Sequence, residues 1–197
     1  MPLRNRVTPT GEIIADPARG TVFGNRGCLH DADGQIRRQF ASKAWIACRL
    51  EFKGRRRPLL QPGRYTELFF LDEATALAAG HRPCAECRRE DYKAFLAAAG
   101  ATRAPELDAR LHAERMHRHE RPFDALPDGV FVWHDDAAWL VNERLHRWTP
   151  GGYTDAIARP GGNAVVLTPP TSIEVLAGGW RPHAVPLFFR AGPRRRG

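Results

Sequence analysis

Two cysteines separated by two residues, Cys84 and Cys87, are the feature that constrains this chain most. Pro83 precedes them and disfavours helix at the residue before it, so both are expected on an extended turn. Two thiolates at this spacing can bind one metal ion at about 2.3 Å, which is half of a tetrahedral zinc site. The other two cysteines, Cys28 and Cys48, can complete a four-thiolate Zn site. Such a closed site leaves no position for a catalytic water, so its expected role is structural.

The composition favours a bound metal over two disulfides. The 197 residues are 43% hydrophobic, and no apolar run reaches the roughly 18 to 20 residues that span a bilayer. The N-terminus leads into polar sequence rather than into the apolar core of a signal peptide. We therefore expect a cytoplasmic protein without a membrane partner, whose cysteines stay reduced. His30, two residues after Cys28, is an alternative ligand in its place.

The charge predicts a polyanionic partner. The net charge is +8, and 27 of the 30 basic residues are arginine. Basic residues that neutralise phosphates release condensed counterions, which favours nucleic-acid binding. The alternative is that the arginines reflect only genome composition and solubility. The candidate nucleic-acid contacts are the clustered basic residues Arg37, Arg38, Lys53, Arg55, Arg56, Arg57, Arg88 and Arg89, with Arg194, Arg195 and Arg196 forming a basic tail.

The first half of the chain predicts strands followed by two helices. Asp72 is placed to cap a helix over residues 73–79, and Gly80 to end it in the left-handed conformation. A second helix is expected from Arg89 to Ala99, ending at Gly100. The strands are predicted, from β-branched and aromatic residues, over 21–23, 44–52 and 65–70.

The second half predicts a helix and then a sheet. Residues 105–120 have helical spacing, and Thr171 with Glu174 spells a capping box for a short helix that stops at Gly178. Trp133, Trp139 and Trp180 are expected in the core, whereas Trp148 and Tyr153 could also stack on bases. Strands are predicted over 130–134, 138–141, 144–148 and 164–167.

The segment from Phe69 to Cys87 resembles the Ada metal-binding domain. The resemblance rests on Phe69-Phe70-Leu71-Asp72-Glu73-Ala74 and on Ala79-Gly80-His81-Arg82-Pro83-Cys84-Ala85-Glu86-Cys87. It implies a small strand-and-helix fold that holds zinc with four cysteines and binds DNA. Cys84 and Cys87 match the second cysteine pair of the family, and His81 stands where the family prefers an aromatic residue. The first pair departs from the family, because Cys28 and Cys48 are far apart rather than a few residues apart.

These patterns together predict an α+β fold: a small Ada-like zinc-binding lobe, a helical connector and a β-rich C-terminal lobe. The expected parts are a flexible lead-in (1–20), the Ada-like zinc-binding domain (21–100), the helical connector (101–125), the β-rich lobe (126–190) and the basic tail (191–197).

The function indicated is that of a zinc-containing DNA-binding protein in damage recognition or repair, with DNA favoured over RNA. One alternative is a metal-dependent nuclease for DNA or RNA, with His112 and His119 as candidate catalytic residues near His117, Glu114 and Glu120. Another, implied by the resemblance, is a methyl-accepting repair protein that uses a zinc-bound thiolate, for which Cys28 is the candidate. A third is an interaction scaffold with a structural zinc. The sequence does not predict the oligomeric state.

Overall fold

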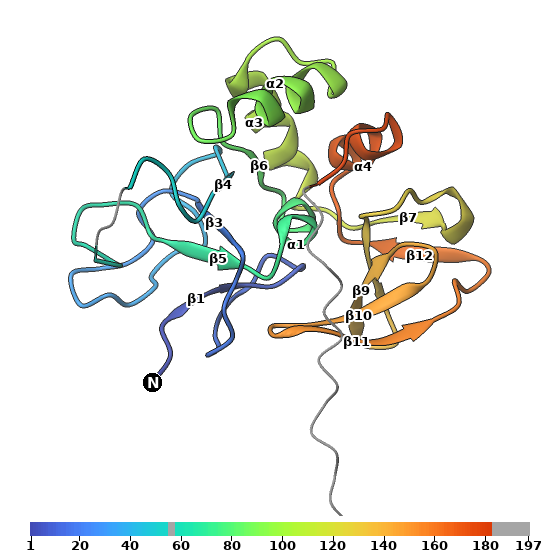
Figure 1. The fold of residues 1–197 in the computed structure, drawn as a ribbon, viewed down its shortest axis with the longest axis horizontal. Coiled ribbons are helices and arrows are strands. Elements are labelled where there is room, and N and C mark those ends of the chain that lie inside the picture. The colour runs from blue at the N-terminus through green and yellow to red at the C-terminus, as the bar shows by residue number, and fades with distance from the viewer. Residues whose placement is uncertain (55–57, 183–197) are drawn as a thin grey trace, which may run out of the picture.

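The computed structural model describes residues 1–54 and 58–182. Within them the protein is a mixed α+β structure with two six-stranded sheets and four α-helices (Figure 1). None of these helices is long and apolar enough to cross a membrane. Arg55, Arg56, Arg57, the end of the predicted β-rich lobe and the basic tail lie outside the described residues.

The first sheet is built from the N-terminal half of the chain. Residues 4–15, expected to be part of a flexible lead-in, instead form two of its strands, because Val7 and Ile13 are buried in its core. β1 pairs in parallel with β5, and β4 in parallel with β6. In chain order the strands are β1 (Arg4–Val7), β2 (Ile13–Ala15), β3 (Val22–Asn25), β4 (Ile46–Cys48), β5 (Leu68–Phe70) and β6 (Arg82–Pro83), with the spatial order β2-β1-β5-β3-β4-β6.

The second sheet is antiparallel throughout and comes from the C-terminal half. Asp135 and Asp136 both have positive φ, 44° and 54°, the backbone that a two-residue hairpin turn requires, so the turn predicted there is confirmed. The strands are β7 (His119–Pro122), β8 (Phe131–His134), β9 (Ala137–Val141), β10 (Leu145–Thr149), β11 (Gly152–Ile157) and β12 (Asn163–Val166), in the order β11-β10-β9-β8-β12-β7.

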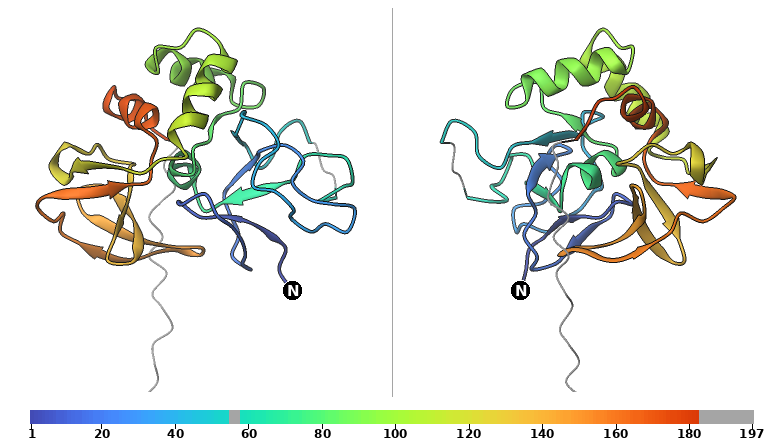
Figure 2. Two further views of the ribbon diagram at one scale, coloured as in Figure 1. Left: turned by 180° about the vertical axis from the view of Figure 1, so that it is seen from behind. Right: turned by 45° about the vertical axis from the view of Figure 1, so that its right-hand side comes forward.

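The four helices are α1 (Glu73–Ala78), α2 (Arg89–Ala98), α3 (Ala104–Glu114) and α4 (Pro170–Ala177). α1 lies between the sheets, and α2, α3 and α4 lie together along one side of the molecule (Figures 1 and 2). The Asp72 carboxylate accepts the Thr75 N–H at 2.7 Å, and Gly80 has a φ of +80°, so the predicted cap and stop of α1 are both confirmed. A short 3-10 helix, Phe123–Ala125, follows β7.

The third and fourth helices differ from their predicted forms. α3 ends at Glu114 rather than continuing to Glu120, and His119 lies in β7. The Glu114 carboxylate accepts the backbone N–H of Thr171 at 3.0 Å and its hydroxyl at 2.6 Å. Thr171 therefore does not form a capping box with Glu174: a carboxylate from α3 supplies the acceptor, and no side chain of Pro169, the N-cap residue, can do so.

One hydrophobic core runs across the predicted boundaries. Leu77 of α1, Phe95 of α2 and Leu107 of α3 pack in the same cluster as Val132 and Trp139 of the second sheet. The helices expected in the zinc-binding lobe and in the connector therefore share a core with the β-rich half. Trp139 is buried as predicted, whereas Trp133 is 39% exposed.

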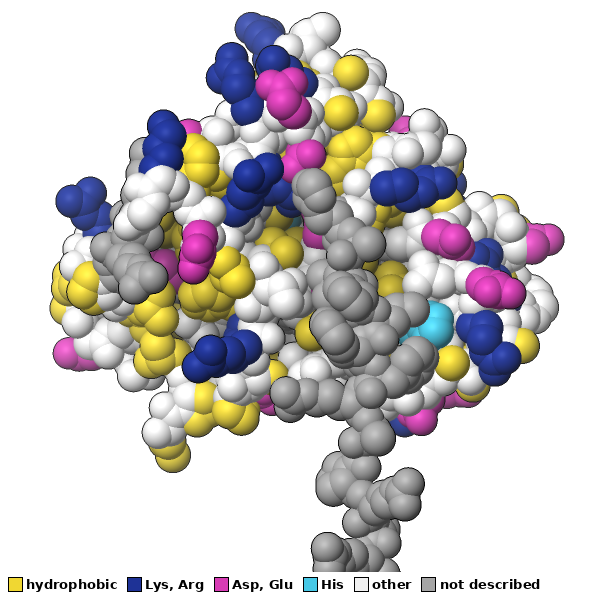
Figure 3. Space-filling model, in the orientation of Figure 1, with side chains coloured by type: hydrophobic (Ala, Val, Ile, Leu, Met, Phe, Trp, Pro, Cys, Tyr) yellow, Lys and Arg dark blue, Asp and Glu magenta, His cyan; other side chains and the backbone are white. Residues whose placement is uncertain are grey.

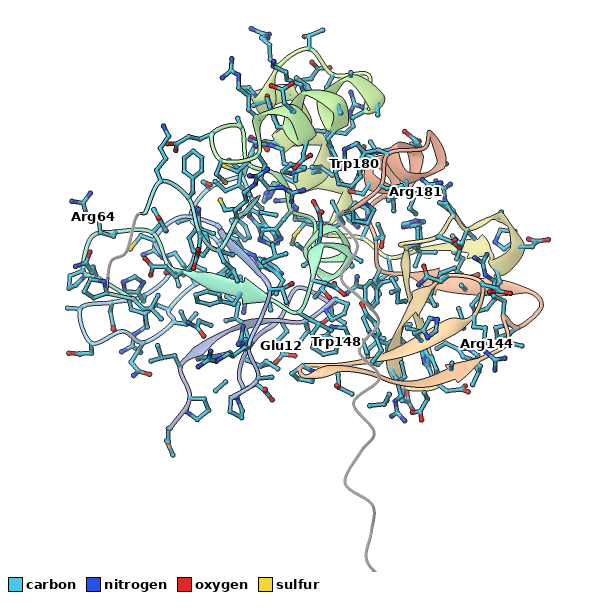
Figure 4. All side chains as sticks on the ribbon, in the orientation of Figure 1. Glu12, Arg64, Arg144, Trp148, Trp180 and Arg181 are labelled. Atoms are coloured by element: carbon cyan, nitrogen blue, oxygen red, sulfur yellow. The ribbon has the colours of Figure 1, made fainter. Side chains whose placement is uncertain are left out.

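Two aromatic residues fasten the second sheet to α1. The indole N–H of Trp148, labelled in Figure 4, donates to the Thr75 hydroxyl at 3.1 Å. The buried Tyr153 hydroxyl donates to the Asp72 carboxylate at 2.5 Å, and burial together with that carboxylate raises the pKa of Tyr153 well above its usual value. These contacts assign both residues a structural role at the start of the helix that leads to Cys84 and Cys87.

Candidate metal centre and the adjoining pocket

Three of the four cysteines lie close enough to hold a metal ion. The sulfur atoms of Cys48, Cys84 and Cys87 all lie within 4.8 Å of one another, and none of them forms a disulfide. Thiolates bound tetrahedrally to one zinc ion lie about 3.8 Å apart, given a zinc–sulfur bond of about 2.3 Å. The three side chains are buried, with 8 to 9% of each residue exposed. We call this group the cysteine triad.

The first sheet brings the triad together. β4 and β6 pair in parallel, with Ala47 beside Pro83, so the next residue of each strand places Cys48 beside Cys84. The Cys84 N–H donates to the Ala47 carbonyl at 2.9 Å and fixes this register. The two residues that follow Cys84 turn the chain so that Cys87 meets the same point. Cys84 and Cys87 are close in the sequence, whereas Cys48 comes 39 residues before Cys87. The pairing of the strands is therefore what completes the triad.

Backbone donors around the triad favour thiolates. The Arg49 N–H donates to the Cys87 sulfur and the Glu86 N–H to the Cys84 sulfur, each at 3.4 Å. The thiols of Cys48 and Cys87 also donate towards Cys84 and lower its pKa, whereas the same contacts and burial raise the pKa of Cys48. Three clustered sulfurs cannot all become anionic without a cation among them, and a soft divalent ion bound there would supply the missing charge.

Buried ion pairs hold the turn that carries Cys84 and Cys87. The Arg82 guanidinium binds Asp108 of α3 with two hydrogen bonds, at 2.8 and 2.9 Å, and both side chains are less than 10% exposed. Arg88 binds Glu73 of α1 and donates to Asp91 of α2 at 2.9 Å. Burial alone would lower the pKa of Arg88, but these two carboxylates raise it above its usual value. The turn is therefore fixed to three helices.

The residue before the turn behaves like the aromatic residue that the resemblance led us to expect. His81 is fully buried between the rings of Phe70 and Trp45, at centroid distances of 4.6 and 5.2 Å. Its Nε2 atom accepts the Arg26 Nε–H at 3.2 Å. Burial, with Arg26 and Arg115 nearby, lowers the pKa of His81 well below its usual value, so it is a neutral packing residue.

Cys28 and His30 lie apart from the triad. Cys28 is half-buried, and its thiol points to the His30 carbonyl at 3.7 Å. Both ring nitrogens of His30 are within hydrogen-bonding distance of protein atoms: Nδ1 lies 2.6 Å from the Thr66 hydroxyl and Nε2 lies 3.2 Å from the Gln61 carbonyl oxygen. The structure thus brings together three of the four predicted zinc ligands, and neither Cys28 nor its alternative is among them.

A pocket of about 550 Å³ opens beside the triad, and all three cysteines line it. Its walls are aromatic: the Phe23 ring lies 6.1 Å from the Tyr65 ring and 5.9 Å from the Phe69 ring, and Phe52 lines the same space. Pockets of this size bind small organic ligands or a single group of a larger one. The sequence did not predict this pocket, because its lining comes from β3, β4, β5 and the loops after β4.

The basic residues predicted to contact nucleic acid differ in their surroundings. Arg38, Lys53 and Arg89 are exposed, and the Lys53 amine lies 5.1 Å from the Phe52 ring at the pocket. Arg37 is exposed and forms an ion pair with Asp31 at 2.6 Å. Arg88 departs from the prediction, because its side chain is 4% exposed and held by two carboxylates.

One further basic residue lines the pocket and another is adjacent to a lining residue in the chain; neither was predicted. Arg49 lines it, and Arg64, at the left edge of Figure 4, precedes the pocket residue Tyr65. Hydrophobic side chains gather over β3, β4 and β5 with Lys and Arg side chains around them (Figure 3). This surface combines apolar rings with positive charge.

The histidines proposed for a nuclease do not converge. His112 lies on α3 with its ring against Phe40, whereas His119 lies on β7. In residues 1–54 and 58–182, the cysteine triad is the one group of three or more possible ligands close enough to share an ion. Burial and nearby cations lower the pKa of both histidines, which leaves them neutral at pH 7. Glu114, the carboxylate expected beside them, is bound to Thr171.

Comparison of this chain with protein-family models, with curated proteins and with solved structures finds no match. The Ada-like resemblance therefore stays a prediction carried by the residues quoted for it.

Proposed function

We propose that this chain is a zinc protein that binds nucleic acid, DNA in preference to RNA, in damage recognition or repair. The observation that carries the proposal is the joining of the cysteine triad to an aromatic pocket with basic residues around it. Zinc is the ion assigned to the triad, because soft thiolates select zinc over the harder divalent cations. The Ada-like pattern around Cys84 and Cys87 supports the same zinc role and the connection with repair.

The pocket's chemistry suits nucleic acid better than it suits a protein partner. Aromatic rings stack on unpaired bases, and nearby arginine and lysine side chains follow the phosphates. The pocket offers both within one small area: the rings of Phe23, Tyr65 and Phe69, and the cations of Arg49 and Lys53. An interaction scaffold would need neither the rings nor the cations at this place.

No observation favours the two enzymatic alternatives. His112 lies on α3 and His119 on β7, and they do not share a group of possible ligands. Cys28, the candidate methyl acceptor, is outside the triad and so lacks the zinc that would keep its sulfur nucleophilic.

Removing Arg49 and Arg64 should weaken DNA binding and reduce its salt dependence. For the double variant Arg49→Ala/Arg64→Ala, we expect the slope of log K against log salt on single-stranded DNA to fall by about 0.7 for each phosphate that the protein no longer neutralises. The measurement is fluorescence anisotropy with labelled single-stranded and duplex DNA, and with RNA of the same sequence, between about 50 and 200 mM salt.

The matched control removes two exposed arginines, Arg147 of β10 and Arg144 just before that strand. Arg144 lies on the opposite side of the molecule from Arg64 in Figure 4. Alanine at both positions lowers the net charge equally but should leave the slope closer to that of the unchanged protein. Equal loss of affinity in the two double variants would mean that binding depends on total charge rather than on the pocket, and no binding at low salt would refute the proposal.

A further inference from the structure

The pocket contains a buried acidic residue that the metal centre does not use. Glu67 is 3% exposed and lines the pocket. Its Oε2 atom accepts the Leu60 N–H at 2.9 Å, which fixes the orientation of the carboxylate. Within the part of the chain that the structure describes, the other oxygen, Oε1, is buried without a hydrogen-bond partner. A buried acceptor in this state is costly, so the pocket favours a ligand that brings a donor.

The register of the first sheet puts Glu67 on the same face as the aromatic rings and one cysteine of the triad. Phe23 of β3 pairs with Cys48 on one side and with Phe69 on the other, so these three form one row. Gly24 pairs with Leu68, so Glu67 comes beside Asn25 in the next row. Side chains two residues apart along a strand point to the same face. The carboxylate of Glu67 therefore lies on the same face of the sheet as the rings of Phe23 and Phe69 and the thiol of Cys48.

The apolar walls define the shape of the ligand. The Phe23 ring is tilted at 48° against Tyr65 and at 54° against Phe69, and all three rings line the pocket, so its walls suit a flat apolar ring. The volume of about 550 Å³ is ample for one nucleobase with its sugar but not for a run of stacked bases. A flat ring with N–H groups along one edge satisfies the walls and Glu67 at once.

We propose that this pocket binds a single unstacked guanine base, with its donor edge against Glu67. The inference rests on the proposed nucleic-acid function and names the group that the pocket takes. Guanine alone among the four DNA bases presents two adjacent donors, N1–H and the N2 amino group, on its pairing edge. A carboxylate can accept both, since no described residue donates to Oε1 and Oε2 keeps a second lone pair. Thymine presents one N–H between two carbonyl oxygens, which the carboxylate repels.

The test compares oligonucleotides that differ at one base. A 15-residue oligothymidylate carrying one central guanine should bind the zinc-loaded protein at least about tenfold more tightly than oligothymidylate itself, since hydrogen bonds to a charged acceptor are strong. Replacing that guanine by inosine, which lacks the N2 amino group, should remove most of the gain. Equal binding of the guanine and thymine strands would overturn the inference.

Two variants assign the preference to the carboxylate. Glu67→Gln should reduce the preference for guanine to about twofold or less, while oligothymidylate should bind at least as tightly as it does to the unchanged protein, because the amide no longer repels its carbonyl oxygens. Glu51→Gln, which removes an exposed charge outside the pocket, should keep the preference. A preference that survives in Glu67→Gln would overturn the inference. Should Glu67→Gln fail to fold, the inosine strand still tests the inference with the unchanged protein. Binding of that strand as tight as that of the guanine strand would overturn it.

The same titrations separate this inference from the proposed function. If no oligonucleotide binds at low salt, the proposed function fails and the inference with it. If oligonucleotides bind without regard to guanine, the proposed function stands and the inference fails. Free guanosine monophosphate should compete only at far higher concentration than the guanine-containing strand. Equal affinity of the free nucleotide would show that the pocket takes a soluble nucleotide rather than a base within a strand, and would overturn the assignment.

Discussion

Cys84→Ser should abolish stoichiometric zinc binding, and Cys28→Ser should not. Cys84 is one of the three cysteines of the triad, so its loss leaves two thiolates, too few for a stable zinc site. Structural zinc sites supply folding free energy on the order of 10 kcal/mol in small peptides, so we also expect Cys84→Ser to lower the unfolding temperature sharply. The measurement is zinc content by mass spectrometry after gel filtration with a weak chelator, together with thermal unfolding.

Cys28→Ser is the matched control for this experiment. Its thiol is half-buried and directed at the His30 carbonyl, so the serine variant should keep one zinc per chain. Zinc retained in Cys84→Ser would contradict the assignment of the triad. Loss of zinc in Cys28→Ser would show that the fourth cysteine joins the site, as the sequence predicts, through a rearrangement of the loop that carries it.

Asp108→Asn should destabilise the protein by about 3 to 5 kcal/mol, because it leaves the buried Arg82 guanidinium without its anionic partner. The pair joins β6 to α3 immediately before the cysteines, so zinc affinity should fall as well. Urea unfolding followed by circular dichroism measures the change as a shift of the midpoint. Replacing both partners, as Arg82→Met/Asp108→Leu, should be much milder, since no charge is then left buried alone.

Glu106→Gln provides the control on the same helix. Glu106 is exposed and pairs with Arg110 at 3.4 Å, an interaction that water screens. The urea midpoint of unfolding of Glu106→Gln should stay close to that of the unchanged protein. A midpoint for Asp108→Asn that is no lower than that of Glu106→Gln would mean that the buried pair does not hold the turn in place.

Local signals predicted much of this fold. The Asp72 cap, the Gly80 stop, the hairpin at Asp135 and Asp136 and the Cys-x2-Cys turn each lie within a few residues of the feature that specifies them. The spacing of hydrophobic residues also predicted the α+β class, because segments with strand periodicity and segments with helix periodicity are separate along the chain. The strands of residues 4–15 were missed, since segments of three or four residues carry too little pattern and become strands only when a partner such as β5 lies beside them.

The site was predicted less completely, for the same physical reason. The sequence supplies four cysteines but not the pairing of β4 with β6 that selects Cys48 and excludes Cys28. Arg88 and Arg89 are equivalent in sequence, yet Glu73 and Asp91 bury only the first. Glu67 could have been noticed, because alternation along residues 65–70 puts this charge on the same face as Tyr65 and Phe69. The pocket that makes it significant depends on three strands and two loops.

The central claim, that the zinc centre organises a nucleic-acid pocket, has a direct test in one sample of protein. Binding of a labelled single-stranded oligonucleotide is measured before zinc is removed with a chelator, after its removal, and after zinc is restored under reducing conditions. Because the triad forms one end of the pocket, affinity should fall by about tenfold or more when the metal is removed and should return with it. Affinity and salt dependence that stay the same in all three states would contradict the claim.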